Sequence, residues 1–376
     1  MGRLLHDRFV TIFNANLQPS LLYDKCRLSA ISPIVGMIIQ SVDATGVYMT
    51  STEAQFSEDD FVRLTGEAVK RFSIFYRHGN TTCLKGWTDT NDPLFIKYFR
   101  GGDGGMNAAA EYQALTKYYD GMKDSQTCKC QKPLGLFQDD TIGGAILSEW
   151  TTARRGDRYF KLFMPFGFLR RRGIVGAADW LSTFHNVSGL SQSPLIQCVD
   201  LDRLMEDLSL VSAAQYFAGE KAKLQKKVAE FGAQLHDAKS EPVLCSKMHG
   251  DFTPANLFIT RKEVIGFDFT AKSTGPVLLD IGKFLTTLIW YGYFDLRKAP
   301  GEKFLDDVTL FMSAYSKRVA IDPPEIRRIF LVKALVDLAR RLETEAKAGG
   351  AKKATKKKHR ARVLGVLGHV LGERRR

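Results

Sequence analysis

Two carboxylates and one amide stand at spacings that suit metal-assisted chemistry on a phosphoryl group. The segment that carries the first two groups reads His249-Gly250-Asp251-Phe252-Thr253-Pro254-Ala255-Asn256, and Asp268 follows shortly after it. In loops with the spacing H-x-D-x-x-x-x-N, the Asp orients an acceptor hydroxyl and takes its proton, while the Asn oxygen binds a metal ion. The sequence therefore points to phosphoryl-transfer chemistry at this segment.

A hairpin is predicted between Asn256 and Asp268. Two short apolar, β-prone runs, 257–260 and 264–267, flank Arg261-Lys262-Glu263, which is typical of two antiparallel strands joined by a turn. If the turn centres near Lys262, Asn256 and Asp268 lie opposite each other. Directly opposed Cβ atoms are roughly 5 Å apart, so their oxygens could share one hard cation such as Mg²⁺.

Each of these residues also has a plainer interpretation. Asp251 could be a turn residue, Asn256 the start of a strand and Asp268 the end of one. Their combined spacing, with His249 ahead and a hairpin between, favours a site over three unrelated features.

On these residues the chain resembles the aminoglycoside phosphotransferase and choline kinase family of small-molecule kinases. The family signature is H-G-D-x-x-x-x-N with apolar residues after it, then an Asp beyond a short hairpin, a Gly-Asp or Gly-Pro pair and a further Asp. The matching residues here are His249-Gly250-Asp251, Asn256-Leu257-Phe258-Ile259, Asp268, Gly275-Pro276 and Asp280-Ile281-Gly282.

The resemblance implies an α+β, bilobal, protein-kinase-like fold, with a small antiparallel-sheet N-lobe and a mostly helical C-lobe. It implies Asp251 as the catalytic base, Asn256 and Asp268 as magnesium ligands, and ATP as the phosphoryl donor. Gly250 stands where protein kinases carry Arg, which favours a small-molecule hydroxyl over a protein as acceptor. Asp280 is expected either to brace the catalytic loop or to cap the helix that follows it. His249 is expected to be a structural residue packed behind Asp251.

The nucleotide lobe is predicted from three strands at 72–76, 83–87 and 93–99. In the kinase scheme, a lysine on the third strand grips the nucleotide phosphates and pairs with a helical Glu. Lys97 fits that position, and Glu111 is the one acid in a helix predicted over Ala108–Tyr119 with Asn107 as its cap.

Three connecting segments are less distinctive. The stretch 77–82 either overlies phosphates or is a plain hairpin turn, and the glycine cluster 101–105 predicts a flexible connector because it lacks G-K-[ST]. Glu149 and Thr151 follow an apolar strand where the adenine of ATP is expected to meet the hinge between the lobes.

We predict four regions: an N-terminal extension at 1–60, the N-lobe at 61–148, the C-lobe at 149–346 and a basic tail at 347–376. A capping box at Ser57-Glu58-Asp59-Asp60 starts the first helix. Buried helices are predicted around Leu224, Val228, Phe231 and Leu235, and over 304–315 and 325–345.

Composition is that of an ordinary globular enzyme. The chain has 376 residues, 44% hydrophobic and 25% charged, and no apolar run of about 20 residues that could span a bilayer. Its first residues lack the plan of a secretory signal, and its six cysteines are scattered without paired metal spacing. We expect a cytoplasmic protein with reduced thiols.

The basic charge is concentrated in the tail. Eleven Lys and Arg residues and one acid, Glu373, give 347–376 a charge of +10 out of the formal +13. A solvated strip is predicted over 349–362, followed by an apolar stripe over 362–372. The tail could contact an anionic membrane peripherally, but a solubilising tail or a terminal helix docked on the body is the simpler interpretation. No specific nucleic-acid binding is expected.

The acceptor is the least defined part. Five arginines, at 154, 155, 170, 171 and 172, argue mildly against a polycationic aminoglycoside, although solvated surface is the preferred interpretation of them. A sugar, an amino alcohol or a related glycan or lipid head group fits the residues. Two alternatives stay open: a catalytically inactive nucleotide-binding scaffold, and a membrane or nucleic-acid-associated protein that works through its tail.

Overall fold

The computed structural model describes residues 56–163, 167–212, 221–269, 273–291, 300–347 and 353–372. These residues all belong to one compact unit. The extension predicted at 1–60 therefore lies almost entirely outside the described residues.

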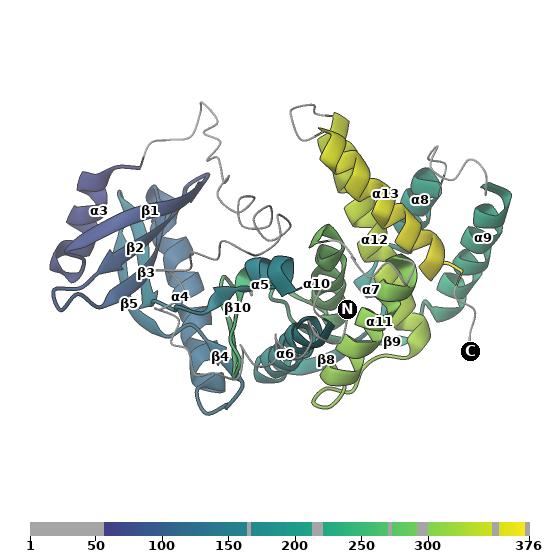
Figure 1. Cartoon of the computed structure of the whole chain (residues 1–376), viewed down its shortest axis with the longest axis horizontal. Helices are drawn as coiled ribbons and strands as arrows, with labels where there is room; N and C mark the ends of the chain where they lie inside the picture. Colours follow the sequence, from purple (N-terminus) through teal and green to yellow (C-terminus); the bar gives the residue numbers. More distant parts are fainter. Residues whose placement is uncertain are drawn as a thin grey trace, which may run out of the picture. The chain divides into compact units, whose positions relative to one another are not determined.

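An antiparallel sheet forms the first lobe (Figure 1). Its five strands follow the order β1-β2-β3-β6-β5. Their bounds are Arg71–His78 (β1), Thr81–Trp87 (β2), Pro93–Arg100 (β3), Pro133–Asp139 (β5) and Gly143–Glu149 (β6). The three strands predicted from the sequence are β1, β2 and β3, so that prediction is confirmed.

The pleat of β3 determines which side of the sheet each residue faces. Ile96 and Tyr98 are buried against Phe61 of α3 (Glu58–Thr65), whose N-cap Ser57 accepts a hydrogen bond from the Asp60 amide as predicted. Because successive side chains in a strand point to opposite faces, Lys97 faces the other side. The helix on that side is α4 (Gly102–Met122).

The start of α4 corrects a prediction. The helix begins at Gly102 and not at Ala108, so Asn107 is not its cap and the glycine cluster is its first turn. A Cβ on Gly104 would lie 2.3 Å from the Phe99 carbonyl oxygen. The glycines are thus required for α4 to press against β3, and this close approach brings Glu111 to Lys97.

Two small sheets connect the lobes to the catalytic segment. One has the order β4-β11-β10-β7, the other β12-β9-β8. Their strands are β4 (Cys128–Cys130), β7 (Arg154–Arg155), β8 (Leu190–Pro194), β9 (Pro242–Lys247), β10 (Leu257–Ile259), β11 (Val264–Gly266) and β12 (Thr274–Pro276).

The second lobe is mostly helical, as predicted. Its elements are α5 (Gly156–Phe163), α6 (Gly167–Ser188), α7 (Leu195–Cys198), α8 (Leu201–Ser212), α9 (Lys221–Ala238), η4 (Pro254–Asn256), α10 (Val277–Tyr291), α11 (Pro300–Tyr315), α12 (Pro324–Lys347) and α13 (Lys353–Val370). The predicted buried helices correspond to α9, α11 and α12, and their apolar faces join one continuous core. No helix among the described residues is both long enough and apolar enough to cross a bilayer.

One arginine expected on the surface is buried. Arg170 of α6 forms an ion pair with Asp307 of α11, and both side chains are almost fully excluded from solvent. Paired charges can be buried because each satisfies the other. The interpretation of Arg170 as solvated surface is therefore wrong, while Arg171 and Arg172 beside it are exposed.

The tail is largely a docked helix. The strip predicted over 349–362 is solvated between 354 and 358, as expected, but from Lys353 onward it is helical and not an irregular, mobile strip, because α13 begins there. The apolar stripe is buried against the neighbouring helices α11 and α12, with Val363, Leu367 and Val370 at or below 1% exposure. Because that stripe is buried against the protein, the predicted membrane contact through it is not supported, and the alternative of a docked terminal helix is the one observed.

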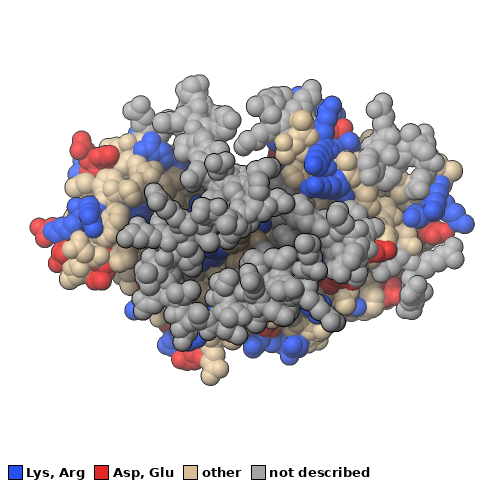
Figure 2. Space-filling model, in the orientation of Figure 1, with Lys and Arg blue, Asp and Glu red and all other residues tan. Residues whose placement is uncertain are grey.

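Polar contacts hold both ends of α13. Arg360 pairs with Glu343 of α12 at 2.9 Å, and Lys356 pairs with Glu345 at 3.0 Å. At the other end, the Arg328 guanidinium donates to the carbonyl oxygen of Leu371 at 2.9 Å, which satisfies a group that a helix C-terminus leaves without a partner. The remaining basic side chains of α13 lie on the surface as a patch of positive charge (Figure 2).

We expect Leu367→Ala to lower the free energy of unfolding by about 2–5 kcal/mol, because a fully buried leucine leaves a cavity behind. The exposed Lys357→Ala on the same helix is the matched control and should change it by about 0.5 kcal/mol at most. Urea denaturation followed by circular dichroism measures both. A Leu367→Ala protein as stable as the wild type would contradict the docking of α13.

Candidate active site

The hairpin that carries the metal-ligand candidates has a register one residue different from the prediction. Phe258 pairs with Ile265, and the Phe267 amide donates to the Asn256 carbonyl oxygen at 3.2 Å. Asn256 therefore lies opposite Phe267, and the predicted pairing with Asp268 is wrong. Asp268 comes one residue later and has a φ of +63°, a left-handed conformation that Asp tolerates better than most residues.

The Asn256 side chain is held by Asp251, at the other end of the candidate catalytic loop 249–256. Its amide nitrogen donates to the Asp251 carbonyl oxygen at 2.8 Å and to Asp251 Oδ2 at 3.0 Å. Both N–H groups are used on Asp251, so the amide oxygen points away from it. A carboxylate and an amide oxygen are the hard donors that Mg²⁺ takes, and Asp268 and Asn256 supply one of each.

Lys97 joins the two lobes through ion pairs. Its ammonium donates to both oxygens of Glu111 at 2.8 Å and also to Asp268, which lies 171 residues later in the chain. Burial alone would lower the pKa of Lys97, but the carboxylates of Glu111 and Asp268 outweigh it and the pKa is raised. Lys97 is therefore a fixed positive charge beside the candidate metal ligand.

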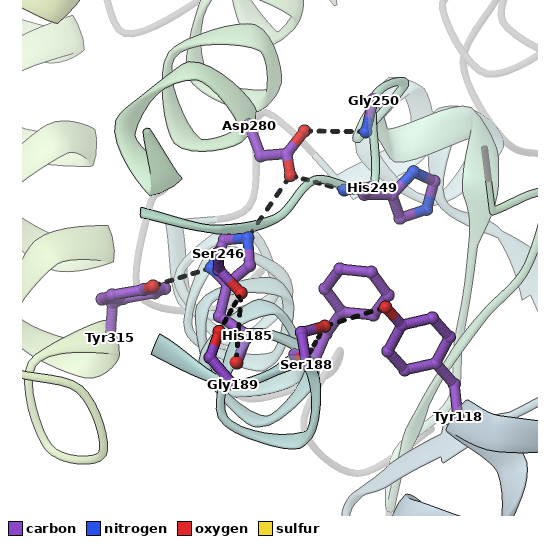
Figure 3. Close-up of polar contacts among 10 residues, drawn as sticks. Tyr118, His185, Ser188, Gly189, Ser246, His249, Gly250, Asp280 and Tyr315 are labelled. Atoms are coloured by element: carbon purple, nitrogen blue, oxygen red, sulfur yellow. Dashed lines mark hydrogen bonds and ion pairs between the residues drawn. The ribbon is translucent and has the colours of Figure 1, made fainter. Parts of the chain in front are cut away.

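A buried carboxylate braces the catalytic loop (Figure 3). Asp280 accepts the His249 amide at 2.8 Å and the Gly250 amide at 3.1 Å. Because α10 begins at Val277, Asp280 is not its N-cap, and the bracing alternative is the one observed. Gly250 has a φ of +82°, which only glycine adopts at little cost.

His185 extends this brace into the helical lobe. Its Nε2 lies 3.3 Å from Asp280 Oδ2 and its Nδ1 lies 2.7 Å from the Tyr315 hydroxyl. Figure 3 shows the chain of contacts from Tyr315 through His185 and Asp280 to the loop. The sequence analysis missed His185, and a lone histidine in an apolar helix offers little signal.

An aromatic stack lies directly behind the carboxylates. The Trp180 indole lies parallel to Phe252 at 7° and to Phe269 at 3°, with ring centroids 5.7 and 6.0 Å away. His249 is fully buried beside the indole, and burial lowers the pKa of its imidazole. The structure thus places His249 behind the site as a packing residue, where the sequence analysis expected it.

A cavity of about 330 Å³ opens beside Lys97. It is lined by Asn80, Thr81, Lys97, Phe99, Arg100, Asp103, Gly104, Asn107, Glu111, Asp268 and Phe269. Asn80 and Thr81 come from the β1–β2 hairpin predicted to overlie phosphates, although its turn at Gly79 is also an ordinary hairpin turn. Asp251 and Asn256 do not line this cavity; Asn256 is linked to its edge through its carbonyl oxygen, which accepts the amide of Phe267, the residue before Asp268.

The hinge candidates lie where β6 leaves the sheet. The Glu149 amide donates to the Lys132 carbonyl oxygen at 3.0 Å, and its carbonyl oxygen accepts from Gln131 at 3.0 Å. Thr151 Oγ1 accepts the Ala153 amide at 3.1 Å. Neither residue lines the cavity beside Lys97, and their contact with an adenine stays a prediction.

One charged residue beside the candidate base Asp251 was missed. Lys283 of α10 lies with its ammonium 2.7 Å from Asp251 Oδ1. The signal was present in the sequence: between Val277 and Trp290, Asp280 and Lys283 are the only charged residues in an otherwise apolar helix. A lysine in such an apolar helix indicates a specific partner of opposite charge.

The sequence has no match among protein-family models or among curated proteins, but solved structures do match. An aminoglycoside phosphotransferase from Alicyclobacillus acidocaldarius is 13% identical, with 84% of this chain and 96% of that chain covered and a TM-score of 0.52. Glucosamine kinase is 11% identical, covering 79% and 90% of the two chains at a TM-score of 0.48. An ethanolamine kinase from Plasmodium vivax is 10% identical, covering 89% and 95% at 0.48. The match to the Alicyclobacillus enzyme confirms the α+β, bilobal, protein-kinase-like fold that the resemblance implied.

Proposed function

We propose that this protein is an ATP-dependent phosphotransferase that phosphorylates a hydroxyl group of a small molecule with Mg²⁺. One observation carries the proposal: Lys97 binds both the helical Glu111 and Asp268, and thereby joins the nucleotide lobe to the segment that follows the catalytic loop. A phosphoryl-transfer centre needs a lysine, a metal-binding carboxylate and a base in one place. Asp251, held to Asn256, supplies the base.

Each residue then has a role that its contacts support. Lys97, positioned by Glu111, binds the α- and β-phosphates of ATP, and Glu149 and Thr151 flank the adenine. Asn256 and Asp268 hold Mg²⁺, which neutralises charge on the phosphate oxygens when bound. Asp251 orients the acceptor hydroxyl and takes its proton as the oxygen attacks the γ-phosphorus. Asp280 keeps the loop in place through its amides.

The acceptor belongs to the small alcohols. A sugar, an amino alcohol or a glycan or lipid head group would present the hydroxyl that Asp251 requires. The solved structures with this fold include proteins named for aminoglycosides, glucosamine and ethanolamine, all of which bear hydroxyl groups. A search for the acceptor should therefore cover sugars, amino alcohols and related hydroxyl-bearing small molecules.

The test is ATP consumption in the presence of fractionated metabolite pools, with and without Mg²⁺. We expect one or more pools to give Mg²⁺-dependent ADP release together with transfer of γ-labelled phosphate to a small molecule. Asp237→Asn, which changes an exposed acid on α9 outside the loop, controls for the loss of one charge. Nucleotide binding without transfer to any pool would favour a catalytically inactive scaffold instead.

A further inference from the structure

Lys283 lies against the candidate base and away from the nucleotide lysine. Its ammonium is 2.7 Å from Asp251 Oδ1, while the other carboxylate oxygen, Oδ2, accepts from Asn256. The side chains of Lys283 and Asp251 are 42% and 47% exposed. Both charged groups are therefore accessible from solvent at the point where an acceptor must approach.

The helix that carries Lys283 is rigidly packed. A Cβ on Gly282 would lie 2.9 Å from Ala334 Cβ of α12, and Phe284 and Leu285 are fully buried. The half-open positions of α10 recur every fourth residue, at Leu279, Lys283 and Thr287, which places them on one face of the helix. Lys283 is the only charged residue on that face, so α10 fixes the base of its side chain beside Asp251.

The charge of Lys97 alone does not balance the negative charge expected at the site, so a second cation would be favourable there. Lys97 is already matched by two carboxylates, those of Glu111 and Asp268, whereas the transferring phosphoryl group brings further negative charge. An ammonium has three N–H donors, and the contact with Asp251 Oδ1 uses one of them. Any hydroxyl oxygen within hydrogen-bond reach of Asp251 also lies close to Lys283.

We infer that Lys283 is a second catalytic cation, which donates hydrogen bonds to the oxygens of the transferring phosphoryl group from the acceptor side. The inference rests on the proposed function. The acceptor oxygen bonds to the γ-phosphorus as the bond from that phosphorus to the β–γ bridging oxygen breaks. The electron pair of that bond leaves with ADP, and the hydroxyl proton goes to Asp251. Lys283 stays protonated throughout and stabilises the charge that spreads over the phosphoryl oxygens.

The test measures binding and needs no known acceptor. MgADP with aluminium fluoride mimics the transferring phosphoryl group, and calorimetry gives the dissociation constant of ADP with and without fluoride. We expect Lys283→Met to bind MgADP within about twofold of the wild type but to lose about 10- to 100-fold of the affinity gained from aluminium fluoride. Lys283→Arg should keep most of that gain, because it retains the charge.

Lys262→Met is the matched control, since it removes the same charge from the exposed β10–β11 turn; it should behave as the wild type. A Lys283→Met protein with the full fluoride gain would overturn the inference. The inference would also be overturned if Lys283→Met lost the same factor of MgADP affinity with and without aluminium fluoride, because Lys283 would then be a structural residue. A wild-type protein that binds MgADP but gains nothing from fluoride would overturn the proposed function itself, and the inference with it.

Discussion

Asp251→Asn should lower the rate of phosphoryl transfer by about 10²–10⁴-fold, the range for loss of a general base, and leave MgATP binding nearly unchanged. The reason is geometric: Asp251 contacts Asn256 of the same loop and Lys283 of α10, and it does not line the cavity beside Lys97. An amide keeps the shape of the side chain and removes its ability to take a proton. Single-turnover transfer from γ-labelled ATP to an active metabolite pool, together with nucleotide titration, measures both quantities.

Asp237→Asn removes an exposed carboxylate elsewhere in the same lobe and should transfer phosphate at the wild-type rate. If Asp251→Asn also retained most of the wild-type rate, Asp251 would not be the base. A variant that failed to bind nucleotide would mean that the loop had collapsed, and the comparison of melting temperatures would reveal it.

Asp268→Asn should have the second large effect, a fall in turnover on the order of 10³-fold together with loss of the Mg²⁺ dependence of ATP binding. The carboxylate is expected to hold the cation and also pairs with Lys97. Asn is the appropriate replacement because it tolerates the positive φ of +63° at this position. An alanine there would add backbone strain, so the effect of losing the metal ligand could not be separated from the effect of that strain.

Titration of the variant with ATP, with and without Mg²⁺, distinguishes the loss of a metal-binding side chain from a change in the fold. Wild-type protein should bind MgATP more tightly than metal-free ATP, and Asp268→Asn should bind the two alike. If the variant still prefers MgATP to the wild-type extent, Asp268 is not a metal ligand.

Local patterns predicted many of the elements, whereas the bilobal arrangement was expected only from the family resemblance. Alternating strands, the Ser57 cap and the amphipathic helices α9, α11 and α12 all follow from neighbours within a few residues. The hairpin was also found, but its register was one residue off. Register depends on the turn that closes it, where Thr260 Oγ1 accepts the amides of Lys262 and Glu263, and the apolar pattern alone does not show that turn.

The remaining errors share one physical cause, which is long-range packing. Glycines at the start of α4 normally predict a loop, yet the close contact of Gly104 with Phe99 makes them part of a helix. Arg170 is buried because Asp307, far along the chain, neutralises it. The basic composition of 353–362 indicated an irregular strip, whereas the packing of the apolar stripe that follows it against α11 and α12 makes the whole segment one helix. Likewise, the partners of His185 and Lys283 are defined only once the chain has folded.

The parallel rings around Trp180 tie the chemistry of the protein to its hydrophobic interior. Phe252 directly follows Asp251, Phe269 directly follows Asp268, and both rings lie nearly parallel to the same indole. The separation between Asp251, the proposed base, and Asp268, the proposed metal ligand, thus depends on how these rings pack. Replacing Trp180 by a smaller residue would change that separation, so an interior substitution would alter turnover even in a protein that still folds.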